Sequence, residues 1–205
     1  IKLVHALFIW VIFLLSFIGH LEANHGPGIG GAATTIPAIT LKSGTFSLGL
    51  RTELTEFESI SDSKLLDKAG DAGSFDAIDR TFLHTFDIGY GITDDLTLGL
   101  NIGWFEAINF RESELEDGET EVFRADPDGL TDLWLSGKYR LWRGPQGHYA
   151  ILSGVKFPTG VDDRKNNEGE ELEAVEQPGS GYYDFTNGFA YSRWFTKDWT
   201  IDKNI

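Results

Sequence analysis

The sequence predicts an all-β fold: an antiparallel up-and-down transmembrane β-barrel, incomplete, with about six strands and the start of a seventh. Three observations predict it. Apolar and small or polar residues alternate in segments of about ten residues, short turns alternate with long loops, and the negative charge is confined to the long loops. The 205 residues include 24 Gly, 15 Phe, 6 Tyr, 6 Trp and no Cys. This composition excludes a disordered acidic chain, and the lack of Cys excludes disulfide scaffolds and thiolate metal sites.

Residues 1–23 have the features of a secretory signal peptide. Lys2 precedes a mostly apolar run, Leu3 to Ile18, and the small residue Ala23 follows it. The run is shorter than the roughly 20 residues of a membrane-spanning helix, although an uncleaved anchor is the alternative. In either case the chain leaves the cytoplasm. Residues 24–43, rich in Gly and Pro, are expected to form a flexible periplasmic leader, and whether this leader plugs the barrel is left open.

The remaining residues, 44–205, are expected to form the partial barrel, because six segments alternate with period two. The segments are, in order, 46–55, 81–92, 96–104, 132–141, 149–157 and 183–192, and a seventh begins at Trp199. Each places bulky apolar residues on one face, namely Phe46, Leu48, Leu50 and Leu54; Phe82, Phe86, Ile88 and Tyr90; Leu96, Leu98, Leu100, Ile102 and Trp104; Leu133, Leu135, Tyr139 and Leu141; Tyr149, Ile151, Val155 and Phe157; Tyr183, Phe185, Phe189 and Tyr191.

The opposite face of these segments distinguishes a membrane barrel from a soluble sandwich. A sandwich would turn its polar face to bulk water and favour long charged side chains there. Here that face is rich in Gly, Ser and Thr, as expected where strands curve around a lumen. Aromatic residues also gather near the strand ends, which is typical of the girdles at the two membrane interfaces.

The connections between the segments alternate strictly in length. Short turns at 93–95, 143–147 and 196–198 alternate with loops at 58–79, 106–128 and 158–180. The three loops carry net charges of −4, −7 and −5, so the rest of the chain is nearly neutral despite a total of −15. Outer-membrane barrels have short periplasmic turns and long outer loops, so this pattern places all three acidic loops outside.

Three polar residues fall on the predicted apolar face and break the pattern. His84 lies in the second segment, and Asn187 and Arg193 lie in the sixth. Arg193 can extend its charged head to the periplasmic interface. For Asn187 we expect a bulge or a shifted strand assignment.

The strand count predicts that the sequence is a fragment of a longer chain. Single-chain bacterial barrels have an even number of strands, from eight upward, and six strands with the start of a seventh cannot close. An open edge in lipid would leave backbone groups unpaired at several kcal/mol each.

Several stretches resemble the MetA-pathway of phenol degradation family, a group of outer-membrane transporter barrels. The matching stretches are DGLTDLWLSGKYRLW (128–142), ILSGVKFPTG (151–160) and QPGSGYYDFTNGFAYSRWF (177–195), and FDIGYGITDDLTLGLNIGW (86–104) is similar to the family's hairpins. The resemblance implies an outer-membrane channel for aromatic or other hydrophobic small molecules, and no enzyme of phenol breakdown. Family members are longer than this chain, in keeping with truncation.

The charged and amide side chains of the polar face are the candidate lumen residues: Arg51, Glu53, Asp87, Asn101, Asp132, Lys138, Arg140, Lys156 and Asp184. We expect most of them to pair with one another and fill the barrel. The alternative is a constriction that selects solutes by charge and hydrogen bonding. A hydrolase is disfavoured because no Gly-x-Ser-x-Gly motif and no assembled Ser/His/Asp set is found. A structural or adhesion barrel acting through its acidic outer loops is the second functional alternative.

The most acidic loop raises the question of calcium. Glu112, Glu114, Glu116, Asp117, Glu119 and Glu121 crowd it, and calcium prefers several such oxygens. The EF-hand spacing is absent, so a hydrated surface bridged to lipopolysaccharide by shared divalent ions is the main expectation, with Glu114, Glu116, Asp117 and Glu119 as weak candidates for a specific site. No cofactor is predicted. The expected partners are outer-membrane lipid, lipopolysaccharide and small solutes of a Gram-negative bacterium, and the acidity argues against nucleic acid.

Overall fold

The main element of the fold is a seven-stranded antiparallel meander. The computed structural model describes residues 35–72, 74–116, 119–196 and 199–205. Its strands pair in the order β1-β3-β4-β8-β9-β10-β11, so neighbours in sequence are neighbours in space. They are β1 (Phe46–Glu56), β3 (Arg80–Thr93), β4 (Leu96–Ile108), β8 (Leu133–Gly144), β9 (Gly147–Phe157), β10 (Asp184–Thr196) and β11 (Trp199–Asn204). All seven lie where the alternation predicts them, which confirms the all-β, antiparallel fold.

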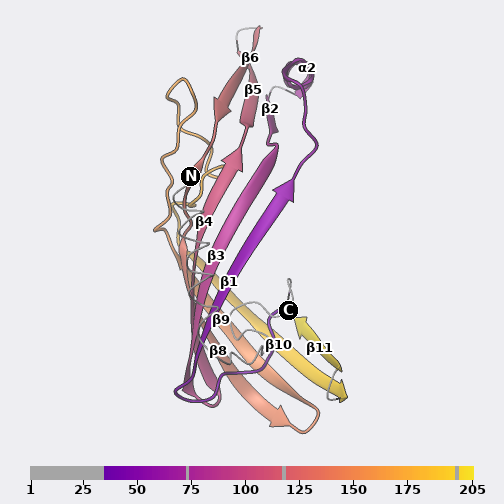
Figure 1. Ribbon diagram of the computed structural model, residues 1–205, viewed down its shortest axis with the longest axis vertical. Helices are drawn as coiled ribbons and strands as arrows, with labels where there is room; N and C mark the ends of the chain where they lie inside the picture. The colour runs from indigo at the N-terminus through magenta and orange to yellow at the C-terminus, as the bar shows by residue number, and fades with distance from the viewer. Residues whose placement is uncertain (1–34, 73, 117–118, 197–198) are drawn as a thin grey trace, which may run out of the picture.

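The sheet curls into a half-barrel whose two edges, within the described residues, are β1 and β11 (Figure 1). The turns at 94–95 and 145–146 lie at one end of it and the long connections at the other, as predicted. The predicted signal peptide, the first part of the leader and the turn at 197–198 lie outside the described residues.

No helix among the described residues has the length and hydropathy needed to cross a membrane.

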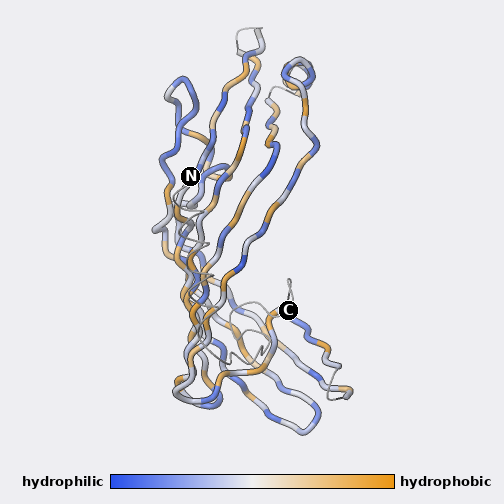
Figure 2. Tube along the Cα trace, viewed as in Figure 1, coloured by the Kyte–Doolittle hydropathy of each residue, from blue (hydrophilic) through white to orange (hydrophobic). Residues whose placement is uncertain are grey.

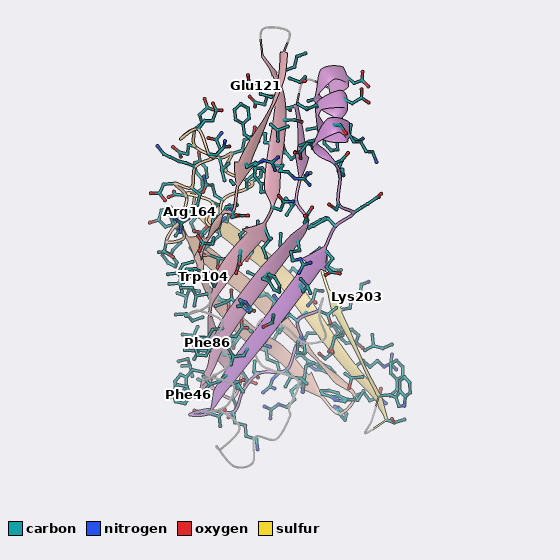
Figure 3. All side chains as sticks on the ribbon, turned by 45° about the horizontal axis from the view of Figure 1, so that its top comes forward. Phe46, Phe86, Trp104, Glu121, Arg164 and Lys203 are labelled. Carbon is teal, nitrogen blue, oxygen red and sulfur yellow. The ribbon has the colours of Figure 1, made fainter. Side chains whose placement is uncertain are left out.

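Strand register arranges the apolar side chains in continuous rows on the outer face of the sheet. One row crosses six strands and consists of Leu48, Ile88, Leu100, Leu135, Val155 and Phe185. Figure 2 shows the alternation of hydropathy along these strands, and Figure 3 shows Phe46, Phe86 and Trp104 at successive heights from the turn end toward the loop end. Because side chains alternate across a strand, the same register sends the intervening small and polar residues to the concave face.

The predicted bulge at Asn187 is wrong. Residues 184–193 of β10 pair with β9 without a register shift, so Asn187 does lie on the apolar face. It is directly opposite Ser153, whose Oγ lies 2.9 Å from Asn187 Oδ1. The other polar exception on β3, His84, is placed similarly, since its Nδ1 lies 3.0 Å from Thr52 Oγ1 across the β1–β3 pair. Asn187 and His84 therefore each lie opposite a polar residue of a neighbouring strand, whereas Arg193 is opposite Gly147 and Ile201.

The first two acidic loops form regular structure where the sequence predicts only loops. Residues 58–79 contain α2 (Asp62–Ala72) and β2 (Ser74–Ala77). Residues 106–128 contain β5 (Phe110–Glu116) and β6 (Glu119–Ala125), and β7 (Asp128–Leu130) begins at their end. β2, β5 and β6 make a second, three-stranded sheet beyond the loop end of the first (Figure 1). β5 continues the direction of β4 after Asn109, whose positive φ of 56° bends the chain. β7 pairs with β4.

A buried arginine fastens α2 to this second sheet. Arg111 on β5 is 4% exposed and donates hydrogen bonds to Ile60 O at 2.7 Å and Asp62 Oδ1 at 2.8 Å. Asp79 Oδ1 lies 3.3 Å from its second terminal nitrogen. The hydrogen bonds from Arg111 and then Arg124 lower the pKa of Asp62 at the helix start. An acidic residue in the first turn also suits the helix dipole.

The third long connection is fixed to the main sheet through Asp132, which precedes β8 and is 5% exposed. Its Oδ1 accepts a hydrogen bond from Gly160 N at 2.9 Å, and its Oδ2 accepts hydrogen bonds from Ser180 N at 2.9 Å and Ser180 Oγ at 2.7 Å. Burial alone would raise the pKa of Asp132, but the hydrogen bonds from Ser180 and Gly160 hold it below its ordinary value. We call this contact the Asp132 junction.

Glycines allow the Asp132 junction to close. A Cβ on Gly160 would lie 2.7 Å from Gly179 Cα, and a Cβ on Gly129 would lie 2.7 Å from Val161 Cγ2. Backbone hydrogen bonds add to the contact: Gly179 N donates to Val161 O, which joins the two ends of the third connection, and Val161 N donates to Leu130 O, which joins it to β7. The Gly-Leu-Thr-Asp, Phe-Pro-Thr-Gly and Pro-Gly-Ser-Gly stretches of the sequence thus meet at one point.

Replacing Asp132 is expected to destabilise the protein. Asp132→Ala leaves three donors without their acceptor and should cost about 2–4 kcal/mol in the free energy of unfolding. Urea unfolding of the full-length protein in phospholipid vesicles, followed by Trp fluorescence, measures this. Asp163→Ala, which removes an exposed carboxylate of the same connection, is the control and should change the midpoint little. Equal effects of the two substitutions would contradict the role assigned to the Asp132 junction.

Candidate functional site

The polar concave face of the half-barrel is the candidate site, because it carries the predicted lumen residues. All nine of Arg51, Glu53, Asp87, Asn101, Asp132, Lys138, Arg140, Lys156 and Asp184 lie on or beside this face by strand register. They occupy different levels between the loop end and the turn end. The levels differ in what the side chains contact, so each is described separately.

One level near the middle of β3 consists of paired polar groups. One cross-strand row runs Asp87, Asn101, Trp134, Lys156 and Asp184. Asn101 Nδ2 donates to Asp87 Oδ1 at 2.7 Å, and Lys156 forms ion pairs with Asp184 and, at 3.7 Å, with Asp132 Oδ2. The mixed charges of this row therefore satisfy one another, with Trp134 as its single aromatic member.

The β1 candidates lie apart from these pairs. Arg51 is opposite Thr85 and Glu53 is opposite Leu83, and both β1 side chains are exposed. Their exposure follows from the position of β1 at an edge of the described sheet, since no described strand covers its far side.

A row of small residues lies next below, toward the turn end. It consists of Ser47, Gly89, Gly99, Ser136, Gly154 and Thr186, one from each of six neighbouring strands, and we call it the small-residue belt. Ser136 Oγ donates to Gly99 O at 3.3 Å. At this level the wall of the half-barrel carries almost no side-chain volume.

An extended segment crosses the concave face at the turn end. Residues 35–45, called the strap, run from β11 toward β3 within the curl of the sheet (Figure 1). At its start, Ile36 N donates to Asn204 Oδ1 and Asn204 Nδ2 donates to Ile36 O, both at 2.7 Å. Further along, Ala38 N donates to Ser192 Oγ and Leu41 N donates to Thr97 Oγ1, both at 2.8 Å. The part of the predicted leader that the structure describes is therefore held to the sheet.

Lys138 and Arg140, two predicted lumen residues, support this end of the structure. Lys138 is 5% exposed and its Nζ donates to Pro37 O of the strap at 3.0 Å. Arg140 is equally buried and its guanidinium donates to Asp95 Oδ1 at 2.7 and 2.9 Å and to Asp94 O at 2.6 Å. Lys138 thus holds the strap, and Arg140 holds the β3–β4 turn.

Small side chains allow the strap to lie this close. Ala38 is completely buried against Ala150 of β9 and Ala190 of β10. At the other end a Cβ on Gly91 would lie 2.1 Å from Lys42 O. From the sequence, the small residues on this face were expected to follow from strand curvature, and no contact of residues 35–45 with them was predicted. The signal that could have revealed it is their concentration toward the turn end, opposite the segment before β1.

Of the weak calcium candidates of the second acidic loop, the structure describes the side chain of Glu114 alone. Glu114 lies on β5 directly opposite Glu121 of β6. The side chains of Glu116, Asp117 and Glu119 lie outside the described residues, so this prediction is not tested.

The strap predicts a specific effect of a small substitution. Gly91→Ala places a methyl group against Lys42 O, so it should displace the strap and cost about 1–3 kcal/mol in the free energy of unfolding. Trypsin cleavage after the exposed Lys42, followed by mass spectrometry, should accelerate. Gly137→Ala is the matched control, because its Cβ would lie at an ordinary 3.7 Å from Leu98 Cδ2. If both variants behave like the unmodified protein, the strap does not hold the position described.

Comparison with known protein families gives a match over the second half of the sequence. Residues 109–205 match the family model described as "Putative MetA-pathway of phenol degradation". The match includes the stretches around Asp132, Gly160 and Ser180 that meet at the Asp132 junction, and it begins after the β3–β4 hairpin. The search of curated proteins and the search of solved structures found no match. Residues 109–205, slightly less than half of the chain, thus match the MetA-pathway of phenol degradation family that the motifs of the sequence predicted.

Proposed function

We propose that the full-length protein is an outer-membrane channel that passes small solutes, aromatic molecules among them, without chemical change. One observation carries the proposal: the half-barrel has an exposed apolar outer face and a polar concave face with a level of minimal side chains. This is the arrangement of a barrel wall between lipid and a lumen. The proposed location is the outer membrane of a Gram-negative bacterium, reached through the predicted signal peptide.

The outer face supports a membrane location. Phe185 is 73% exposed, Phe189 is 62% exposed, and Leu135, in the middle of the sheet, is 43% exposed. Soluble monomers rarely expose a continuous apolar surface of this extent, since its burial is worth roughly 25 cal/mol per Å². Lipid would cover these rows. Near the turn end, tyrosine and tryptophan are close together, with Trp142 and Tyr149 rings 5.5 Å apart, as in an interfacial girdle.

The concave face supports passage of solutes. The charged groups of the row from Asp87 to Asp184 are paired within the wall, and the strap occupies the turn end. Between them lies the small-residue belt, where a solute would meet backbone and small hydroxyl groups. Trp134, beside the belt, offers an aromatic face. The proposed solutes are therefore small and not strongly charged, and the family's pathway name favours aromatic ones.

A structural or adhesion role is the second candidate, because the outer region is ordered. α2 and the β2-β5-β6 sheet form a folded layer beyond the barrel wall, and a binding surface requires such order. A channel can carry such a layer as well. Whether solutes cross the membrane through the protein therefore distinguishes a channel from a structural or adhesion protein.

A lipid-facing position predicts a large cost for a charge. Leu135→Arg should destabilise the protein by about 2–4 kcal/mol in phospholipid vesicles, because Leu135 lies midway along the outer face. On the surface of a soluble protein the same change would alter the free energy of unfolding by only about 0.5 kcal/mol. Val175→Arg, at an 86% exposed position of the third connection, is the control. A cost for Leu135→Arg no greater than for this control would argue against the membrane location.

Transport itself is measured by liposome swelling. The full-length protein should let arabinose and phenylalanine enter liposomes. After correction for solute size, phenylalanine should enter at least as fast as arabinose. Liposomes without protein are the control. Swelling no faster than in the control, together with binding of the protein to cells or matrix, would favour the adhesion role.

A further inference from the structure

The three acidic connections meet at a group of three carboxylates. Asp76 lies on β2 in the first connection, Glu112 on β5 in the second, and Glu176 in the third. One oxygen from each residue lies within 4.8 Å of the others. The stretches that the sequence shows as separate acidic loops thus bring one carboxylate each to a common point, which we call the tricarboxylate cluster.

Strand register makes the contact between the first two carboxylates unavoidable. Asp76 and Glu112 are directly opposite in the β2–β5 pair. Like charges at directly opposed positions destabilise an antiparallel pair. Their neighbours Phe75 and Ser113 alternate to the other face of the sheet, where Ser113 Oγ donates to Leu65 O of α2. The helix therefore covers one face of this sheet, and the tricarboxylate cluster lies on the opposite face.

The third connection is held so that Glu176 reaches this face. Gln177, the next residue, is 9% exposed and donates from Nε2 to Arg164 O and Leu172 O, both at 3.0 Å, while its Oε1 accepts from Arg164 N at 2.9 Å. Arg124 N of β6 donates to Asn167 Oδ1 at 2.7 Å, which joins the connection to the second sheet. The position of Glu176 is therefore set by the fold and does not depend on a flexible loop.

Glu176 has an oxygen that the protein does not satisfy. The residue is only 9% exposed. Its Oε2 accepts a hydrogen bond from Glu173 N at 3.1 Å. Its Oε1 is buried and has no hydrogen-bond partner among the described residues. A buried carboxylate oxygen without a donor is costly, so this atom indicates a missing partner of positive charge.

The nearby charges add to this requirement. The pKa of Glu112 is raised to about 7, mainly by burial and secondly by the carboxylates of Asp76, Glu114 and Glu173. The pKa of Glu176 is likewise raised to about 7, mainly by burial and secondly by the carboxylates of Glu112 and Asp76. The basic residues of β5, β6 and α2 for which contacts are seen are engaged elsewhere, since Arg111 and Arg124 pair with Asp62, and Lys68 lies over the Phe75 ring on the helix side.

We propose that Asp76, Glu112 and Glu176 bind one divalent cation, calcium in preference to magnesium. Calcium accepts six to eight oxygen ligands at about 2.3–2.6 Å in flexible geometry, so three carboxylates on separate segments and several waters suit it. Magnesium requires a more regular octahedron and releases its waters reluctantly. Asp76 is exposed, which leaves a route for the ion and its waters. The bound ion fastens the third connection to the second sheet.

Calorimetry on the purified full-length protein tests the proposal. In detergent free of lipopolysaccharide, and after removal of metal by chelation, titration with CaCl2 should show one site, and titration with MgCl2 should show at least about tenfold weaker binding. Glu176→Gln and Glu112→Gln should each weaken calcium binding at least about tenfold, because each removes a charged ligand. Glu168→Gln, an exposed glutamate of the same connection, is the matched control and should leave binding unchanged.

A second measurement reports the structural effect of the ion. Calcium should slow trypsin cleavage after the exposed Lys165 in the unmodified protein and in Glu168→Gln, and it should have no such effect in Glu176→Gln. If Glu176→Gln fails to fold, Asp76→Asn at the exposed ligand position takes its place. The proposal is overturned if millimolar CaCl2 gives no binding heat. It is equally overturned if binding appears only after lipopolysaccharide is added, or if Glu168→Gln weakens binding as much as Glu176→Gln.

Discussion

The buried carboxylate of Asp132 is the interaction on which the arrangement of the loop end depends. A carboxylate at 5% exposure is stable only with donors on its oxygens, and the chain supplies them from Gly160 and Ser180, one at each end of the third connection. Both ends of that connection are thereby fixed beside β8. Its middle must then pass along the second sheet, where Asn167 contacts Arg124 and Gln177 holds the residues around Glu176.

At the turn end of the half-barrel, buried polar groups also require hydrogen-bond partners, and there the backbone of the strap supplies them. Ser192, Thr97 and Lys138 are buried polar residues of the concave face, and the backbone of the strap satisfies each of them. The chain itself thus satisfies the buried Asp132 at the loop end and these three residues at the turn end. The small-residue belt between them is the level where the wall needs no such partner, because Gly and Ser leave little side chain to satisfy.

The sequence predicted the main sheet well because its two faces meet different surroundings. An apolar outer face and a small or polar inner face give a strong alternation of hydropathy, so all seven strands were placed correctly. The second sheet was not predicted, because its strands lack such an alternation of hydropathy. In β5 the buried Arg111 and Ser113 are polar, and on the opposite face the buried Phe110 is followed by Glu112 and Glu114, so neither face shows an apolar alternation. Burial of Arg111 depends on Asp62 and Asp79 of another connection, which no local pattern contains.

The candidate sites, like the two sheets, were predictable from the sequence only in part. Local alternation determines which face of its own strand a side chain occupies, so the sequence alone identified the nine concave-face residues and the loop end that carries the acidic charge. It could not determine that Lys138 would meet the strap or that Asp76, Glu112 and Glu176 would converge. Those contacts join segments far apart in the chain, and their proximity is set by how the connections close over the sheet. Only the tertiary structure decides that closure, because it depends on packing between elements, about which the period of a single strand carries no information.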